Sequence, residues 1–231
     1  RRRHTRYPLV TGVQTCALPI LTVRRLPVYL VLDTSGSMAG EPIEAVNNGI
    51  RTLISTLSRD PHALETVHIS IITFDRTAKL IMPLTSLDEL NLPSISTPDS
   101  GPTHMGEALQ LLEKQFKSEV IQSTSSTKGD WAPFALVMTD GKASDRQVFN
   151  EMAPRVKNLG FKHIVGCLAG DDASETDLGQ FCDPVLRLAT MDSAAFDQLF
   201  TWVSTAVSGE NKSLGTSKSV ELPPPPKEIT L

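Results

Sequence analysis

Five consecutive apolar residues, Val28-Tyr29-Leu30-Val31-Leu32, constrain the fold of this chain more than any other stretch. A strand with one face in water would alternate apolar and polar residues, because successive side chains point to opposite faces. This run has no polar face, which is typical of a central strand in a parallel sheet covered by helices on both sides. We therefore expect an α/β fold built around this strand.

Strand-like and helix-like patterns alternate along the rest of the chain. Residues 43–57 carry apolar side chains at steps of three and four, the stripe of an amphipathic helix. Only a short turn at Asp75-Arg76 precedes the third strand, so the second and third strands must be antiparallel. The further strands are expected at 67–74, 78–83, 134–138, 163–169 and 185–188. The expected architecture is a central, mostly parallel six-stranded sheet with one antiparallel edge strand and helices on both faces.

Three polar side chains follow the first strand at alternate positions, namely Asp33, Ser35 and Ser37. In extended backbone, residues two apart point the same way, so one carboxylate and two hydroxyls converge. Two distant segments that lead to the same edge of the sheet carry Thr103 and Asp140. Such oxygen ligands suit a hard cation such as Mg²⁺. The alternative is a purely structural role, in which these residues only cap a helix and form turns.

The same five positions resemble the metal-ion-dependent adhesion site (MIDAS) of the von Willebrand factor A (VWA) domain family. That motif reads D-x-S-x-S, with a Thr much later and an Asp in a T-D-G turn, which here is Thr139-Asp140-Gly141. The resemblance covers residues 24–207 and implies a Rossmann-like VWA fold. Pro102 stands where the family commonly has a second glycine, and this difference stiffens the loop that carries Thr103.

The resemblance implies a binding device. In the family, the hydroxyls that match Ser35 and Ser37 contact the metal directly, the residue matching Thr103 does so in the ligand-bound form, and the aspartates often act through water. Two carboxylates roughly balance Mg²⁺ while hydroxyls add no charge, so the cation retains affinity for one more anionic oxygen. A protein partner can supply that oxygen from an Asp or a Glu. We expect Mg²⁺ as the cofactor, with Mn²⁺ and Ca²⁺ as alternatives.

Two other functions stay open at this point. The first is a metal-dependent phosphohydrolase that uses Asp33, with His104 as a candidate base. Against it, Ser35 stands where such enzymes often place a second carboxylate, and no phosphate-binding lysine is evident. The second is an exported VWA adhesion protein, which would need an export signal. We expect a protein that is not an enzyme.

The sequence pattern of residues 1–23 is not that of a folded segment. Arginines precede a broken apolar stretch, but Gln14 and Thr15 interrupt the hydrophobic region that a signal peptide needs. The string from Val10 to Ile20 is similar to translated sequencing-adapter read-through, so we interpret this leader as non-native or disordered. No apolar run approaches the length of a membrane span, and the net charge of −4 is spread over mixed signs. We expect a cytoplasmic protein with no membrane or nucleic-acid partner.

Residues 208–231 are rich in Ser and Lys, lack aromatic residues and contain Pro223-Pro224-Pro225-Pro226. This composition predicts a disordered tail with a short polyproline II segment.

Two further local patterns concern the loops around the predicted site. Ser144 and Gln147 have the spacing of a capping box, which predicts that Ser144 caps the helix that follows it. An acidic group at Asp171, Asp172, Glu175 and Asp177 is interpreted as a solvated loop, with a second cation site as the alternative.

Among the VWA branches, the chain is most similar to the bacterial TerY-type proteins associated with tellurium resistance. The similarity rests on residues 25–38 and on Gly40-Glu41-Pro42-Ile43. It implies an intracellular scaffold in a tellurium-resistance or stress-response system, with kinase- or phosphatase-like partners.

Overall fold

The computed structural model describes residues 24–97, 101–170, 173–213, 222–226 and 229–230. The expected leader at 1–23 lies outside these described residues. Within them, no helix is long and apolar enough to cross a membrane.

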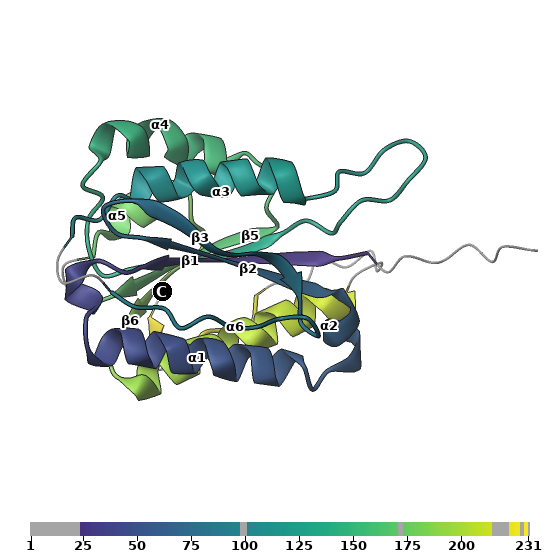
Figure 1. Ribbon diagram of the computed structural model, residues 1–231, viewed down its shortest axis with the longest axis horizontal. Helices are drawn as coiled ribbons and strands as arrows, with labels where there is room; N and C mark the ends of the chain where they lie inside the picture. The colour runs from purple at the N-terminus through teal and green to yellow at the C-terminus, as the bar shows by residue number, and fades with distance from the viewer. Residues whose placement is uncertain (1–23, 98–100, 171–172, 214–221, 227–228, 231) are drawn as a thin grey trace, which may run out of the picture.

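A mixed sheet forms the middle layer of the protein (Figure 1). Across the described residues it has seven strands in the order β3-β2-β1-β4-β5-β6-β7. The inner strands are parallel, and β3 and β7 pair antiparallel at the two edges. The strands are β1 (Leu26–Asp33), β2 (Val67–Phe74), β3 (Ala78–Ser86), β4 (Phe134–Thr139), β5 (His163–Ala169), β6 (Val185–Leu188) and β7 (Ile229–Thr230). The predicted Rossmann-like α/β class, mostly parallel, is confirmed.

Helices cover both faces of the sheet (Figure 1). On one face lie α1 (Glu41–Leu57), α2 (Pro61–Thr66) and α6 (Ser193–Ser213). On the other lie α3 (Met105–Glu119), α4 (Arg146–Lys157) and the short α5 (Glu175–Leu178). A single 3₁₀ turn, η1 (Gly36–Met38), leads from β1 toward α1.

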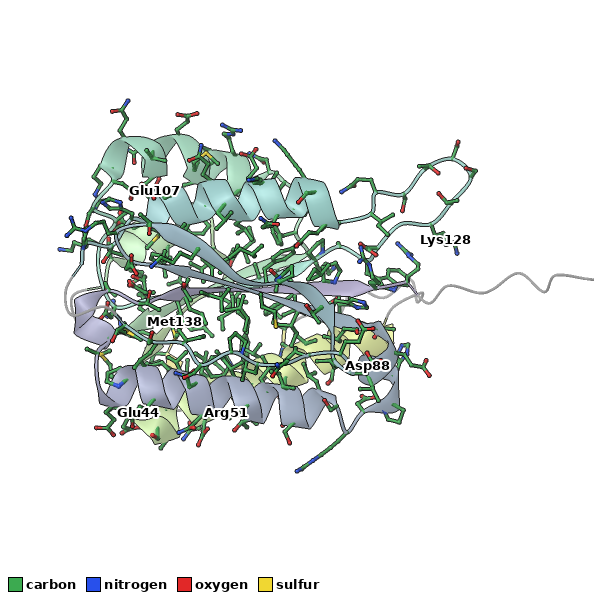
Figure 2. All side chains as sticks on the ribbon, viewed as in Figure 1. Glu44, Arg51, Asp88, Glu107, Lys128 and Met138 are labelled. Atoms are coloured by element: carbon green, nitrogen blue, oxygen red, sulfur yellow. The ribbon has the colours of Figure 1, made fainter. Side chains whose placement is uncertain are left out.

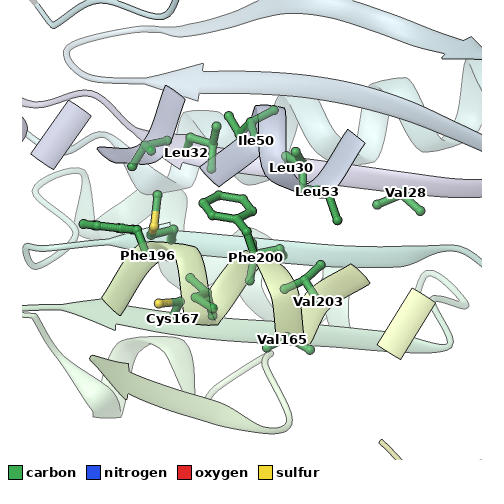
Figure 3. Packing of buried hydrophobic residues seen from close by; sticks show 14 of the residues in the cluster. Val28, Leu30, Leu32, Ile50, Leu53, Val165, Cys167, Phe196, Phe200 and Val203 are labelled. Atoms are coloured by element: carbon green, nitrogen blue, oxygen red, sulfur yellow. The ribbon is translucent and has the colours of Figure 1, made fainter. Parts of the chain in front are cut away.

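The central strand β1 is buried on both faces, as its unbroken apolar run predicted. Val28, Leu30 and Leu32 face α1 and α6, where they belong to one core cluster with Phe196 and Phe200 of α6 (Figure 3). Tyr29 and Val31 point the other way, into the cluster beneath α3 and α4. Two separate cores therefore hold the sheet between its helix layers.

Helices α1 and α6 approach each other closely at Gly49. A Cβ at that position would lie 2.1 Å from Cδ2 of Phe200, whose side chain is fully buried. Glycine is therefore required there for the two helices to pack at this distance.

Two details of the sheet differ from the prediction of six strands with one antiparallel edge. The third strand continues through Pro83 to Ser86, which an edge strand tolerates because one row of its N–H groups faces away from the sheet. A seventh strand, β7, pairs Ile229 with Leu188 of β6, within the tail that was predicted to be disordered. Ile229 is 3% exposed, so one apolar side chain covers the open edge of β6, a signal that the average composition of the tail conceals.

The carboxyl ends of the parallel strands meet at one edge of the sheet. Chain order reverses there between β1, which continues to β2 on one side, and its other neighbour β4. This is a topological switch point, where open α/β sheets place their ligand sites. Met138 near the end of β4 and Glu107 near the start of α3 lie toward this edge, whereas Lys128 lies in a loop at the opposite end (Figure 2).

Candidate metal site

Asp33 is the last residue of β1, and its side chain is completely buried. The backbone N–H of Ser35 donates to its Oδ1 at 2.8 Å, and the hydroxyl of Thr139 donates to its Oδ2 at 2.6 Å. Burial raises the pKa of this carboxyl from 3.8 to about 6; the hydrogen bonds from Thr139 and Ser35 oppose the rise and the nearby charge of Asp140 adds to it. A buried carboxylate of this kind is stabilised by a cation.

The loop after β1 presents the two serines. Ser35 is buried and Ser37 is exposed, and their hydroxyl oxygens lie 3.2 Å apart. The hydroxyl of Ser35 is also 3.5 Å from Oδ1 of Asp140, which follows β4. The loop is fastened to β2 because both the N–H and the hydroxyl of Thr34 donate to the carbonyl of Phe74, at 2.8 and 3.2 Å.

Thr103 reaches the site from the loop before α3. Its side chain is buried against the turn after β4: a Cβ at Gly141 would lie 3.1 Å from Oγ1 of Thr103. A pair of reciprocal hydrogen bonds fixes this approach. The N–H of Thr103 donates to the Ser144 hydroxyl at 3.2 Å, and the N–H of Ser144 donates to the carbonyl of Thr103 at 2.8 Å.

The capping box predicted at Ser144 is wrong, because its hydroxyl accepts from Thr103 and does not cap α4. Its neighbour Asp145 caps a different helix: the N–H groups of Gly106 and Glu107 donate to the two oxygens of its carboxylate, at 3.0 and 2.9 Å. Both side chains therefore connect the Thr103 loop to the Asp140 loop.

Thr139, Ser144 and Asp145 were not predicted from the sequence as residues of the site. Thr139 belongs to the T-D-G turn, but its bond to Asp33 crosses between strands that are 106 positions apart in the chain. The contacts of Ser144 and Asp145 likewise depend on how two loops pack, which no local pattern indicates.

The donor set fits a hard divalent cation. Three loops bring two carboxylates and three hydroxyls to one edge of the sheet: Asp33, Ser35, Ser37, Thr103 and Asp140. Among the described residues no group of three or more His, Cys, Asp or Glu side chains is placed to hold a metal, so a cation here would depend on hydroxyl oxygens as well. The assignment of these five residues as ligands stays a prediction.

Two other predicted features have local partners. The ring Nδ1 of His104 lies 3.4 Å from Oε1 of Glu107 at the start of α3, but among the described residues this buried nitrogen makes no hydrogen bond. In the acidic group, Asp177 accepts from Arg146 at 2.6 Å, while Asp171 and Asp172 lie outside the described residues.

Comparisons with known proteins agree with this architecture. A family model described as the von Willebrand factor type A domain matches residues 28–201. Over 61 residues the chain is 43% identical to the uncharacterized protein sll0103 of Synechocystis sp., a match that covers 26% of this chain and 13% of that protein.

Solved structures share the fold at low identity. The PilB minor pilin of Streptococcus sanguinis superposes with a TM-score of 0.62 at 13% identity, over 87% of this chain and 65% of the pilin chain. Proximal thread matrix protein 1 of the mussel byssus, with a zinc-occupied MIDAS motif, gives 0.58 at 15% identity, over 80% of this chain and 48% of that chain. A von Willebrand factor type A protein of Catenulispora acidiphila gives 0.56 at 15% identity, over 80% and 43%. The present chain thus spans less than two thirds of the length of each of these relatives.

Proposed function

We propose that this chain, which belongs to the von Willebrand factor type A domain family, is a divalent-metal-dependent protein-interaction module. The proposed ligands are Asp33, Ser35, Ser37, Thr103 and Asp140. The observation that carries the proposal is the position of Ser35, whose hydroxyl lies 3.2 Å from that of Ser37 and 3.5 Å from a carboxylate oxygen of Asp140. One oxygen therefore joins the loops after β1 and β4 at the centre of the site.

The chain's own residues prepare the site for a cation. Thr139 and the Ser35 N–H orient the buried carboxylate of Asp33, and Ser144 fixes the backbone of Thr103. The bound metal would supply positive charge that two carboxylates balance but do not exceed, which leaves affinity for an anionic oxygen. The exposed Ser37 marks the side from which a partner's Asp or Glu would approach.

Binding is proposed over hydrolysis because the site combines hydroxyls and carboxylates without drawing on the one histidine predicted beside it. The ring of His104 lies against Glu107, and the His104 backbone N–H donates to the carbonyl of Asp75 at 2.8 Å. These contacts support a role at the start of α3.

The finer part of the proposal concerns the cell. We propose a TerY-type, cytoplasmic scaffold in a tellurium-resistance or stress-response system, which binds kinase- or phosphatase-like partners through Mg²⁺, with Mn²⁺ and Ca²⁺ as alternatives. The support for this part is the sequence similarity at residues 25–38 and 40–43.

The test measures metal and partner in the same variants. Titration calorimetry with Mg²⁺ and Mn²⁺ compares the full chain with Asp33→Ala and with Asp88→Ala, which removes an exposed carboxylate outside the site. Partner capture then compares the same three proteins in Mg²⁺ and in EDTA. We expect metal binding and capture to be lost together in Asp33→Ala and capture to be lost in EDTA. Metal binding that survives Asp33→Ala would contradict the site, and capture that survives both EDTA and Asp33→Ala would contradict the function.

A further inference from the structure

The C-terminal proline segment lies on α6, far along the chain from the predicted metal site. The indole N–H of Trp202 donates to the carbonyl of Pro223 at 2.9 Å. Leu222 packs against the core cluster beneath α6, and Ile229 is buried in that cluster as part of β7. The tail is therefore held at both ends of its proline run.

The contact between Trp202 and the prolines has the chemistry of polyproline recognition. Proline residues offer carbonyl acceptors and no N–H donors, so a surface that binds them must supply donors and flat apolar area. A tryptophan supplies both, and a preformed polyproline II segment loses little conformational entropy when it binds. Trp202 is only 5% exposed, so its ring is covered by its neighbours.

Unfilled space remains on both sides of the proline segment. An open groove of about 530 Å³ lies beside Trp202, Gln198 and the prolines. A second, of about 410 Å³, lies between the prolines and Asp183-Pro184. Gln198 lines the larger space, and among the described residues its Oε1 is buried without a hydrogen-bond partner. The surface can therefore hold more than the segment that now occupies it.

We propose that the face of α6 around Trp202 is a polyproline-binding surface, which residues 222–226 occupy in cis and which binds a proline-rich peptide of a partner when that segment is withdrawn. Only eight residues separate Ser213, the end of α6, from Leu222. So short a link gives the resident segment an effective concentration on the order of 1 mM. A peptide in trans with a Kd of roughly 0.1 mM would then bind about tenfold more weakly to the unmodified chain.

The experiment uses full-length chains in a Trp131→Phe background, which leaves Trp202 as the single tryptophan. In one variant Pro223, Pro224, Pro225 and Pro226 are all replaced by alanine. In a second, Ile229→Asp places a charge at a buried position of β7 and releases the tail by another route. The probe is a labelled peptide with the sequence of residues 222–230, and the readouts are its anisotropy and the fluorescence of Trp202.

We expect the peptide to bind the alanine variant about tenfold more tightly than the parent chain. Ile229→Asp keeps the four prolines and their link to α6, so its gain should be smaller than that of the alanine variant. In the parent chain, acrylamide should quench Trp202 less than in either variant. A control peptide with alanines in place of the prolines should not bind. Trp202→Phe in the alanine variant should lose most of the anisotropy change of the labelled peptide, because the smaller phenyl ring offers less apolar area and has no N–H donor.

Two results would overturn the proposal. If neither tail variant binds the peptide, the surface does not recognise polyproline in trans. If the alanine peptide binds as well as the proline peptide, or if Trp202→Phe leaves binding unchanged, recognition does not depend on the proposed chemistry. Circular dichroism of each variant confirms that the sheet and helices are intact before binding is measured.

Discussion

Asp33→Asn is expected to stabilise the metal-free protein while it abolishes stabilisation by Mg²⁺. The pKa of Asp33 rises from 3.8 to about 6, chiefly because the carboxyl is buried. The native chain therefore holds this proton more tightly than the unfolded chain, and stability falls as the pH rises from about 4 to about 6. At neutral pH the loss amounts to about 3 kcal/mol.

Asparagine retains most of the local hydrogen bonds. Its Oδ1 can accept from the Ser35 N–H as Asp33 does now. Its amide can donate to Oγ1 of Thr139, whose hydroxyl can then donate to the carbonyl of Gly141, 3.4 Å away. Since a buried amide also has a desolvation cost, we expect a net gain of about 1–3 kcal/mol. For a domain of this size the gain corresponds to a rise in Tm of roughly 2–12 °C.

The assay is thermal unfolding at pH 7.5, first in EDTA and then in saturating Mg²⁺. In EDTA the Asn variant should melt above the parent protein; in Mg²⁺ the parent should gain stability with ligand concentration and the variant should not. Glu65→Gln, which removes an exposed carboxylate on α2, serves as the control and should match the parent in both buffers. A variant that melts lower in EDTA would show that the hydrogen bonds to the carboxylate outweigh its burial. Equal stabilisation of all three proteins by Mg²⁺ would show that Asp33 is not a metal ligand.

Three other predictions follow from the same structure. The Mg²⁺ affinity of the parent protein should fall up to tenfold per pH unit below about pH 6, because a proton must leave Asp33 before the metal binds. Calorimetry between pH 5 and 7.5 measures this dependence, and a constant affinity would refute it. Ser144→Ala removes the acceptor of the Thr103 N–H and should weaken Mg²⁺ binding about 3–10-fold, whereas unchanged affinity would show that this bond does not position Thr103. Gly49→Ala should destabilise the protein by about 1–3 kcal/mol in urea unfolding, because the added Cβ would overlap the buried ring of Phe200. Ser55→Ala, at an exposed position of the same helix, is the control, and a neutral effect of Gly49→Ala would show that α1 and α6 can separate without cost.

The features that could be predicted from the sequence are those that a short segment specifies by itself. The apolar run of β1 indicates a central strand because its burial on both faces leaves no polar position. Asp33, Ser35 and Ser37 lie within five residues of one another, so the geometry of one loop brings them together. Thr103 and Asp140 were located by resemblance to a family motif, and the packing of Thr103 against Gly141 appears only in three dimensions.

The features that were missed depend on contacts between distant segments. Ser144 lies in a sequence that suits a capping box, but in the structure its hydroxyl accepts a hydrogen bond from the Thr103 N–H. A local preference of this kind is weak, so tertiary contacts override it. For the tail, a composition rich in Ser, Lys and Pro predicts disorder, yet one buried Ile229 and one indole hydrogen bond are enough to hold part of it against the fold.

The contacts around the proposed metal site favour a geometry that is largely formed before a metal would bind. Pro102 restricts the backbone just before Thr103, and Ser144 and Asp145 fasten the same loop to the loop after β4. A preorganised site loses less entropy on binding, so the cation can be held by few charges. The main unfavourable contribution is instead the desolvation of the buried Asp33 carboxylate. Its described hydrogen bonds come from Ser35 and Thr139, and neither donor is cationic. Metal binding would relieve that electrostatic cost without first having to order the loops. We therefore expect Mg²⁺ to raise the free energy of unfolding while it changes the conformation of the loops little.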